Sequence, residues 1–244
     1  MNNPISNTTR RADAWALGFA LVFPTALTFV YFTLLTKAPL PLQYLAYGLK
    51  VVQFGFPLFW FLKMQRRRLT PRRADGRGIW FALGFGGLTL AAMWLLYKCV
   101  LQPNELMAAA EGQIGTKVKD FGVDTAGAYA ALGLFYALFH SLLEEYYWRW
   151  FVFAQLRRLI SMRWSAAISS LGFMAHHVII LGTFFGPDAP LTWIFSLAVA
   201  GGGIIWAWMY ERWPSLLPVW ISHILIDAAI FLIGYDLVFL KVTT

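Results

Sequence analysis

Two adjacent glutamates and an arginine lie inside a segment that is otherwise apolar enough to cross a membrane. An apolar run covers residues 126–139, and Glu144, Glu145 and Arg149 follow it in the same predicted helix. Charged groups at membrane depth are costly and usually mark functional sites. Glu145 and Arg149 are four residues apart on one helical face, so they can pair. His140 and Glu144 are also four apart, on a face about 100° away, which leaves a second carboxylate beside an imidazole. Such a carboxylate suits a general base, whereas an interhelical salt-bridge cluster is the structural alternative.

All four histidines lie between positions 140 and 223, inside predicted membrane helices. His176 and His177 are neighbours in one apolar segment, and His223 and Asp227 are four residues apart in another. A single histidine in an apolar helix is most often a packed core residue. Four histidines with several carboxylates on three helices indicate a shared site, although His140 or His176 individually can still be a core residue.

The composition determines the class of protein that positions these residues. Of 244 residues, 59% are hydrophobic and 13% are charged, whereas a soluble domain has about 25% charged residues. We therefore expect an all-α, polytopic transmembrane bundle. No long polar stretch could form a soluble domain, so residues 1–244 are predicted to form one membrane domain with its motifs within residues 126–239. One cysteine excludes a disulfide framework. Seven spans are predicted, over residues 15–36, 42–62, 78–100, 126–153, 165–181, 191–210 and 217–239.

The distribution of basic residues predicts the orientation of these spans. With the N-terminus in the cytoplasm, the inside segments contain 13 lysines and arginines and the outside segments contain 4. This bias follows the positive-inside rule, so we expect a cytoplasmic N-terminus and an external C-terminus. The most basic segment, 63–77, could be a surface for anionic lipid or nucleic acid, but topology explains it better. No nucleic-acid partner is therefore expected. The polar segment 101–125 could contain a short interfacial helix.

Three motifs follow one another along the second half of the chain. They are Glu144-Glu145-x-x-x-Arg149, then Phe173-x-x-x-His177, then His223-x-x-x-Asp227. Their order on successive helices resembles the CAAX-protease and bacteriocin-processing (CPBP/ABI) family of intramembrane proteases, which includes the type II CAAX prenyl endopeptidases. In this resemblance His177, rather than His176, is in register with the second motif.

The resemblance implies a protease that hydrolyses a peptide bond of a membrane-associated protein or peptide, in some members a CAAX-type substrate. By position, Glu144 and His177 would activate water, and His223 and Asp227 would form the oxyanion site. Most family members have asparagine where this chain has Asp227, and an ionised carboxylate there would repel an oxyanion. Asp227 must therefore be protonated, pair with His223 or bind a metal.

The resemblance leaves the cofactor open, because such proteases have been described both with and without a metal. The expectation is either no cofactor or a divalent cation, zinc for example, held by Glu144, His177 and His223. The chain has no His-Glu-x-x-His motif, and Glu144 with His177 suffices to activate water, which favours the metal-free mechanism. Phe173, Glu145, Arg149, His140 and His176 are expected to support the site.

Two other classes of function remain as alternatives. The protein could be a non-catalytic membrane scaffold or immunity protein, or an ion transporter that uses the same glutamates and histidines as a relay. No clear internal repeat is present, which argues against many transporter folds. The expected partners are the lipid bilayer and a membrane-associated substrate. The expected location is a bacterial plasma membrane, as a multi-pass protein.

Overall fold

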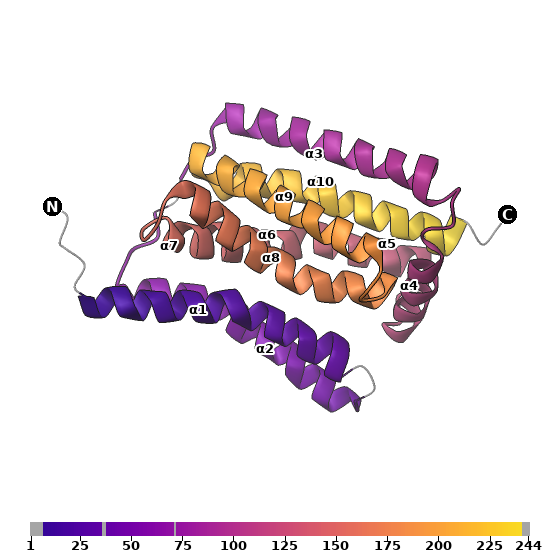
Figure 1. The fold of residues 1–244 in the computed structure, drawn as a ribbon, viewed down its shortest axis with the longest axis horizontal. Helices are drawn as coiled ribbons and strands as arrows, with labels where there is room; N and C mark the ends of the chain where they lie inside the picture. The colour runs from indigo at the N-terminus through magenta and orange to yellow at the C-terminus, as the bar shows by residue number, and fades with distance from the viewer. Residues whose placement is uncertain (1–6, 36–37, 71, 241–244) are drawn as a thin grey trace. The chain divides into compact units, whose positions relative to one another are not determined.

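The computed structural model describes residues 7–35, 38–70 and 72–240, and this part of the chain consists of helices and the segments that join them. The described residues form ten α-helices, which Figure 1 labels α1 to α10. Short π-helical stretches, labelled η, extend or interrupt several of them. The elements are α1 (Asn7–Phe29), η1 (Val30–Leu34), α2 (Leu40–Phe59), η2 (Trp60–Met64), α3 (Gly76–Leu96), η3 (Tyr97–Leu101), α4 (Ala108–Asp120), α5 (Ala126–Phe135), η4 (Tyr136–His140), α6 (Ser141–Glu145), η5 (Tyr146–Phe153), α7 (Ala154–Leu156), α8 (Met162–Phe185), α9 (Pro190–Arg212), α10 (Leu216–Tyr235) and η6 (Asp236–Leu240).

The prediction of a helical membrane bundle is confirmed. Six helical segments in the described residues are long and apolar enough to cross a membrane: Arg11–Leu34, Gly76–Leu101, Ala126–Leu156, Met162–Phe185, Pro190–Arg212 and Leu216–Leu240. The segment predicted as the second span, 42–62, forms α2 and η2 but is not among these six. The count of seven spans and the cytoplasmic N-terminus stay predictions. The polar segment 101–125 does contain a helix, α4.

Local sequence signals mark where three of the membrane helices begin. Thr125 begins the helix of the glutamate motif, and its hydroxyl accepts a hydrogen bond from the Ala128 amide at 3.2 Å. Ser215 caps α10 in the same way, at 3.3 Å from the Leu217 amide. Pro190 occupies the first turn of α9, where its missing N–H costs nothing. These signals place the starts of three of the six apolar helices.

The chain divides into two compact units that are interleaved along the sequence. Unit 1 consists of Met1–Pro71, Tyr147–Ile180 and Ile194–Ala207, and unit 2 consists of Arg72–Tyr146, Leu181–Trp193 and Trp208–Thr244. The helix Ala126–Leu156 runs from unit 2 into unit 1, between Tyr146 and Tyr147. The expectation of a single membrane domain over residues 1–244 stays a prediction.

In unit 2, α10 packs along α3 and also contacts α5 and α6 (Figure 1). The close approach of α3 and α10 requires a glycine at position 86. A Cβ atom there would lie 3.0 Å from the backbone Cα of Ser222 and 2.8 Å from the side chain of Leu225. At the far end of α10, Asp236 accepts hydrogen bonds from Tyr97 Oη at 2.7 Å and Lys98 Nζ at 2.6 Å. These contacts fix the helix that carries His223.

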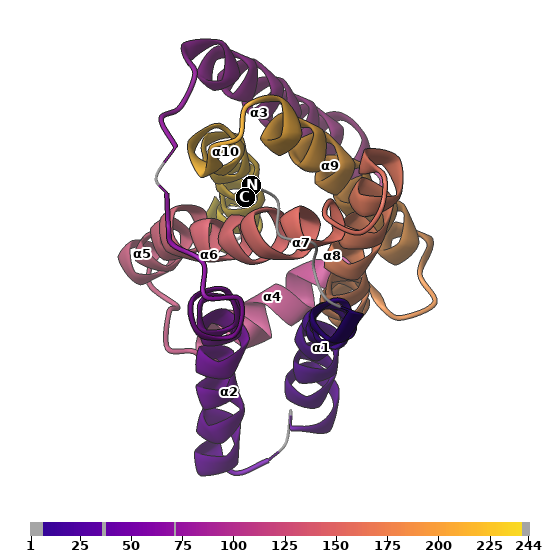
Figure 2. The same cartoon turned by 90° about the vertical axis from the view of Figure 1, so that its left-hand side faces the viewer.

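In unit 1, α1 and α2 are neighbouring helices (Figure 2). They contact each other, and Phe19 packs on Phe56 with ring centroids 4.6 Å apart. Phe56 also contacts Phe151 edge-on at 5.9 Å. The buried Tyr147 donates a hydrogen bond from its hydroxyl to the Ala20 carbonyl at 2.8 Å. The N-terminal helices thereby hold the second half of the glutamate-motif helix.

Candidate active site

Glu144 and Glu145 lie in α6, a short α-helical segment between the π-helical stretches η4 and η5. Glu145 has no exposed surface, and Glu144 is 8% exposed. Because α6 contacts α10 inside unit 2, both carboxylates face the helix of His223 and Asp227. Two buried carboxylates need hydrogen-bond donors or positive charge close by, and His223 provides one such donor.

Glu145 orients the ring of His223. Glu145 Oε1 lies 2.7 Å from His223 Nδ1, a distance typical of a charge-assisted hydrogen bond. An ionised carboxylate can only accept, so Nδ1 must be the donor. This bond fixes the orientation of the imidazole and turns its other nitrogen, Nε2, toward the remaining carboxylates.

Those carboxylates belong to Glu144 and Asp227. His223 Nε2 lies 3.6 Å from Glu144 Oε2 and 3.5 Å from Asp227 Oδ1. Both distances exceed those of normal hydrogen bonds, so the nitrogen faces both groups without being tightly bound to either. Asp227 thus lies near the ring of His223, and its three possible roles stay predictions.

Glu144 also has a histidine on its own helix. His140 Nε2 lies 3.4 Å from Glu144 Oε1, as the spacing of four residues predicts. Glu144 is therefore placed between His140 and His223, with a long contact to each. The shorter contact of the pair of glutamates is therefore the one between Glu145 and His223, 2.7 Å long.

His177, in unit 1, has its own orienting contact. Its Nδ1 lies 2.9 Å from the carbonyl oxygen of Phe173, one helical turn earlier. A carbonyl can only accept, so Nδ1 carries the proton, and in the neutral ring Nε2 keeps its lone pair. His177 is thus held in the tautomer that a general base or a water-orienting group requires.

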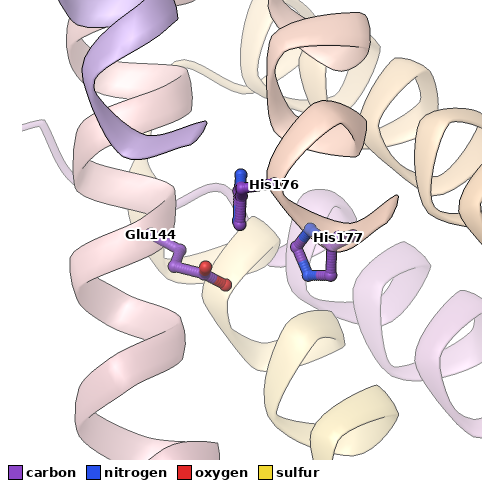
Figure 3. Close-up of side chains that lie close together, drawn as sticks. All are labelled: Glu144, His176 and His177. Atoms are coloured by element: carbon purple, nitrogen blue, oxygen red, sulfur yellow. The ribbon is translucent and has the colours of Figure 1, made fainter. Parts of the chain in front are cut away.

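Arg149 supports Phe173 from the glutamate-motif helix. Its guanidinium carbon lies 4.7 Å from the ring centroids of both Phe173 and Trp206, and the residue is 2% exposed. Stacking of this kind is a cation–π contact on two faces. His176 packs nearly parallel to the Trp148 ring, at 5.8 Å between centroids. Figure 3 shows Glu144 on its helix and His176 and His177 on theirs.

The structure thus brings two sets of predicted residues together, each within its own unit. His140, Glu144, Glu145, His223 and Asp227 form the set in unit 2, and Arg149, Phe173, His176 and His177 form the set in unit 1. No sequence pattern predicts the hydrogen bond between His223 and Glu145, because the two residues are 78 positions apart. The predicted pairing of Glu145 with Arg149 stays a prediction.

A protein-family model matches residues 126–229 of the chain. Its description is "Type II CAAX prenyl endopeptidase Rce1-like". The resemblance predicted from the motifs is confirmed. The Rce1-like segment begins with α5 and ends two residues after Asp227, so it contains every residue of the three motifs. No curated protein and no solved structure matches the chain.

Proposed function

We propose that the protein is an intramembrane endopeptidase, which hydrolyses a peptide bond of a membrane-associated protein or peptide. The observation that supports this most strongly is the Glu145–His223–Glu144 arrangement inside the segment that matches the Rce1-like family. One carboxylate orients an imidazole, and the other stands beside it with longer contacts. A family of proteases and a membrane bundle together favour peptide hydrolysis over ion transport.

In the proposed reaction, Glu144 accepts a proton from a water molecule whose oxygen attacks the scissile carbonyl carbon. His177 orients the same water through Nε2, because its Nδ1 donates to the Phe173 carbonyl. The carbonyl π bond opens and its oxygen becomes an oxyanion. Glu144 then passes the proton to the leaving nitrogen, the C–N bond breaks, and a new carboxyl and a new amine are formed.

His223 would stabilise the oxyanion. Its Nδ1 already donates to Glu145, so it can donate from Nε2 as well only as an imidazolium. Glu144, Glu145 and Asp227 surround the ring with negative charge, which favours that charged form. In this proposal Asp227 acts on the oxyanion through His223 and does not contact it directly.

If the protein bound a divalent metal, these residues would have different roles. Glu144, His177 and His223 would be its ligands, and the metal would polarise the carbonyl or the water. Glu145 at His223 Nδ1 is the kind of outer partner that metal-bound histidines have, so the residues of unit 2 fit such an ion. We propose the metal-free reaction, because Glu144 and His177 already provide a base and a water-orienting group.

Cleavage by the purified protein in proteoliposomes would test the proposal. A peptide that ends in a prenylated CAAX sequence and the same peptide without the prenyl group would be compared by mass spectrometry. Cleavage of either peptide that disappears in the Glu144→Gln variant supports the protease. Release of the last three residues from the prenylated peptide alone would assign CAAX processing. Unchanged activity after dialysis against a chelator supports the metal-free reaction, and its loss with recovery on adding zinc contradicts it.

A further inference from the structure

Unit 1 has a strong excess of positive charge. Its sequence contains twelve lysines and arginines and a single acidic residue, Asp13. That carboxylate is buried and already bonded: Asp13 Oδ1 accepts from Trp60 Nε1 at 3.0 Å and from Gln65 Nε2 at 2.8 Å. Its other oxygen lies 3.4 Å from Arg158 Nη1. Both oxygens of Asp13 are therefore already engaged, and its single negative charge is far outnumbered by the basic residues of unit 1.

The same contacts bring the basic residues together at one end of unit 1. The amides of Gln65 and Gln155 bond to each other in both directions, at 3.0 and 2.9 Å. Together with Asp13, they join the start of α1, the end of η2 and the end of α7. The residues next to them in sequence are basic: Arg11, Lys63, Arg66, Arg67, Arg68 and Arg157.

Among the residues that the structure describes, several of these cations have no ion-pair partner. Lys63, Arg66 and Arg68 are exposed, and within the described ranges no hydrogen bond or ion pair engages their side chains. Arg67 stacks on the ring of Phe61, 5.1 Å from its centroid. Partial burial and then the charge of Arg158 lower the pKa of the Arg67 guanidinium, against an opposing effect of Asp13. The guanidinium groups therefore repel one another, and an anion would relieve that repulsion.

We propose that Lys63, Arg66, Arg67 and Arg68 form a surface that binds the phosphate groups of anionic membrane lipids. Met64 and Leu69 favour a lipid over a soluble anion, because these apolar side chains are 55% and 52% exposed among the cations. Side chains of both kinds at the end of an apolar helix suit the level where headgroups meet acyl chains. The surface lies on unit 1, apart in sequence from the three motifs, so it does not depend on the proposed hydrolysis.

The test is a titration of the full-length protein in detergent with dioctanoyl phosphatidylglycerol, followed by its thermal unfolding. Saturable stabilisation that weakens with added salt is expected, and neither dioctanoyl phosphatidylcholine nor inorganic phosphate should reproduce it. One basic residue near an anionic surface changes affinity about fivefold. The double variant Arg66→Gln with Arg68→Gln should therefore raise the apparent Kd roughly 30-fold.

A matched control removes two charges from α4 in unit 2, by Lys117→Gln with Lys119→Gln. These lysines lie in the last turn of α4, and their removal should leave the Kd unchanged. Equal stabilisation by phosphatidylcholine would overturn the proposal. Equal stabilisation by inorganic phosphate would replace the lipid surface with a simple anion site. An equal loss of affinity in the control variant would show that lipid binding depends only on the net charge of the protein, and would contradict the proposed surface.

Discussion

Replacing Glu145 by glutamine removes a negative charge from a fully buried position and leaves the size of the side chain almost unchanged. The bond to His223 Nδ1, 2.7 Å long, then loses the charge on its acceptor. Charged hydrogen bonds contribute about 1.5–3 kcal/mol to stability and neutral ones about 0.5–1.5 kcal/mol. The free energy of unfolding should therefore fall by about 1–2 kcal/mol. If the predicted pairing with Arg149 also forms, the loss rises to about 3–5 kcal/mol.

The same substitution should slow peptide cleavage. Without the charge of Glu145, less of His223 is present as the imidazolium that donates to the oxyanion. A loss of about 1–2 kcal/mol in the transition state corresponds to a decrease in kcat of roughly 5- to 30-fold. The loss should appear in kcat with little change in KM, because the imidazolium acts on the oxyanion of the transition state. A loss of packing alone would not produce this difference between kcat and KM.

Glu144→Gln is the matched control, since it is the same change one residue earlier. The contacts of Glu144 to His140 and His223 are long, 3.4 and 3.6 Å, so this variant should keep its thermal stability. It should nevertheless lose cleavage, because it lacks the base. Thermal unfolding in detergent and steady-state kinetics in proteoliposomes would separate the two variants. Equal stability and equal activity of the two variants would refute the roles assigned to the glutamates.

Three further substitutions test other parts of the account. Asp227→Asn should retain cleavage at a lower kcat, because Asp227 acts through His223; complete loss of kcat would contradict this role. Arg149→Lys should lower the free energy of unfolding by about 1–2 kcal/mol, since lysine cannot stack on Phe173 and Trp206 together, and an unchanged melting temperature would refute the contact. Gly86→Leu should destabilise by about 1–3 kcal/mol or more, because α3 lies against the backbone of α10, and unchanged thermal unfolding would contradict that packing.

The helices could be predicted from the sequence because apolar runs are long enough to span a membrane and because polar residues mark their ends. The helix over residues 126–156 and the helix in the polar segment 101–125 are examples. The π-helical stretches on both sides of α6 had no signal in the sequence. They widen the helix locally, so the angular positions of side chains beyond Glu145 differ from those of a uniform α-helix.

Contacts within one helical turn could be predicted, and contacts between helices could not. The distance from His140 to Glu144 and the hydrogen bond of His177 to the Phe173 carbonyl both reflect a spacing of four residues. The partner of Glu145 is on another helix, so helical periodicity has no information about it. The spacing of four residues therefore predicts only the pairing of Glu145 with Arg149, whereas the structure shows a hydrogen bond between Glu145 and His223.

The most direct test of the proposed hydrolysis is cleavage in water labelled with oxygen-18. The purified protein in proteoliposomes would receive a membrane-associated peptide, and the products would be analysed by mass spectrometry. Direct attack of a water activated by Glu144 and His177 predicts one heavy oxygen in the new C-terminal carboxylate, and no product from Glu144→Gln. The same rate of cleavage in Glu144→Gln, or no cleavage by a stably folded wild-type protein, would contradict the central claim.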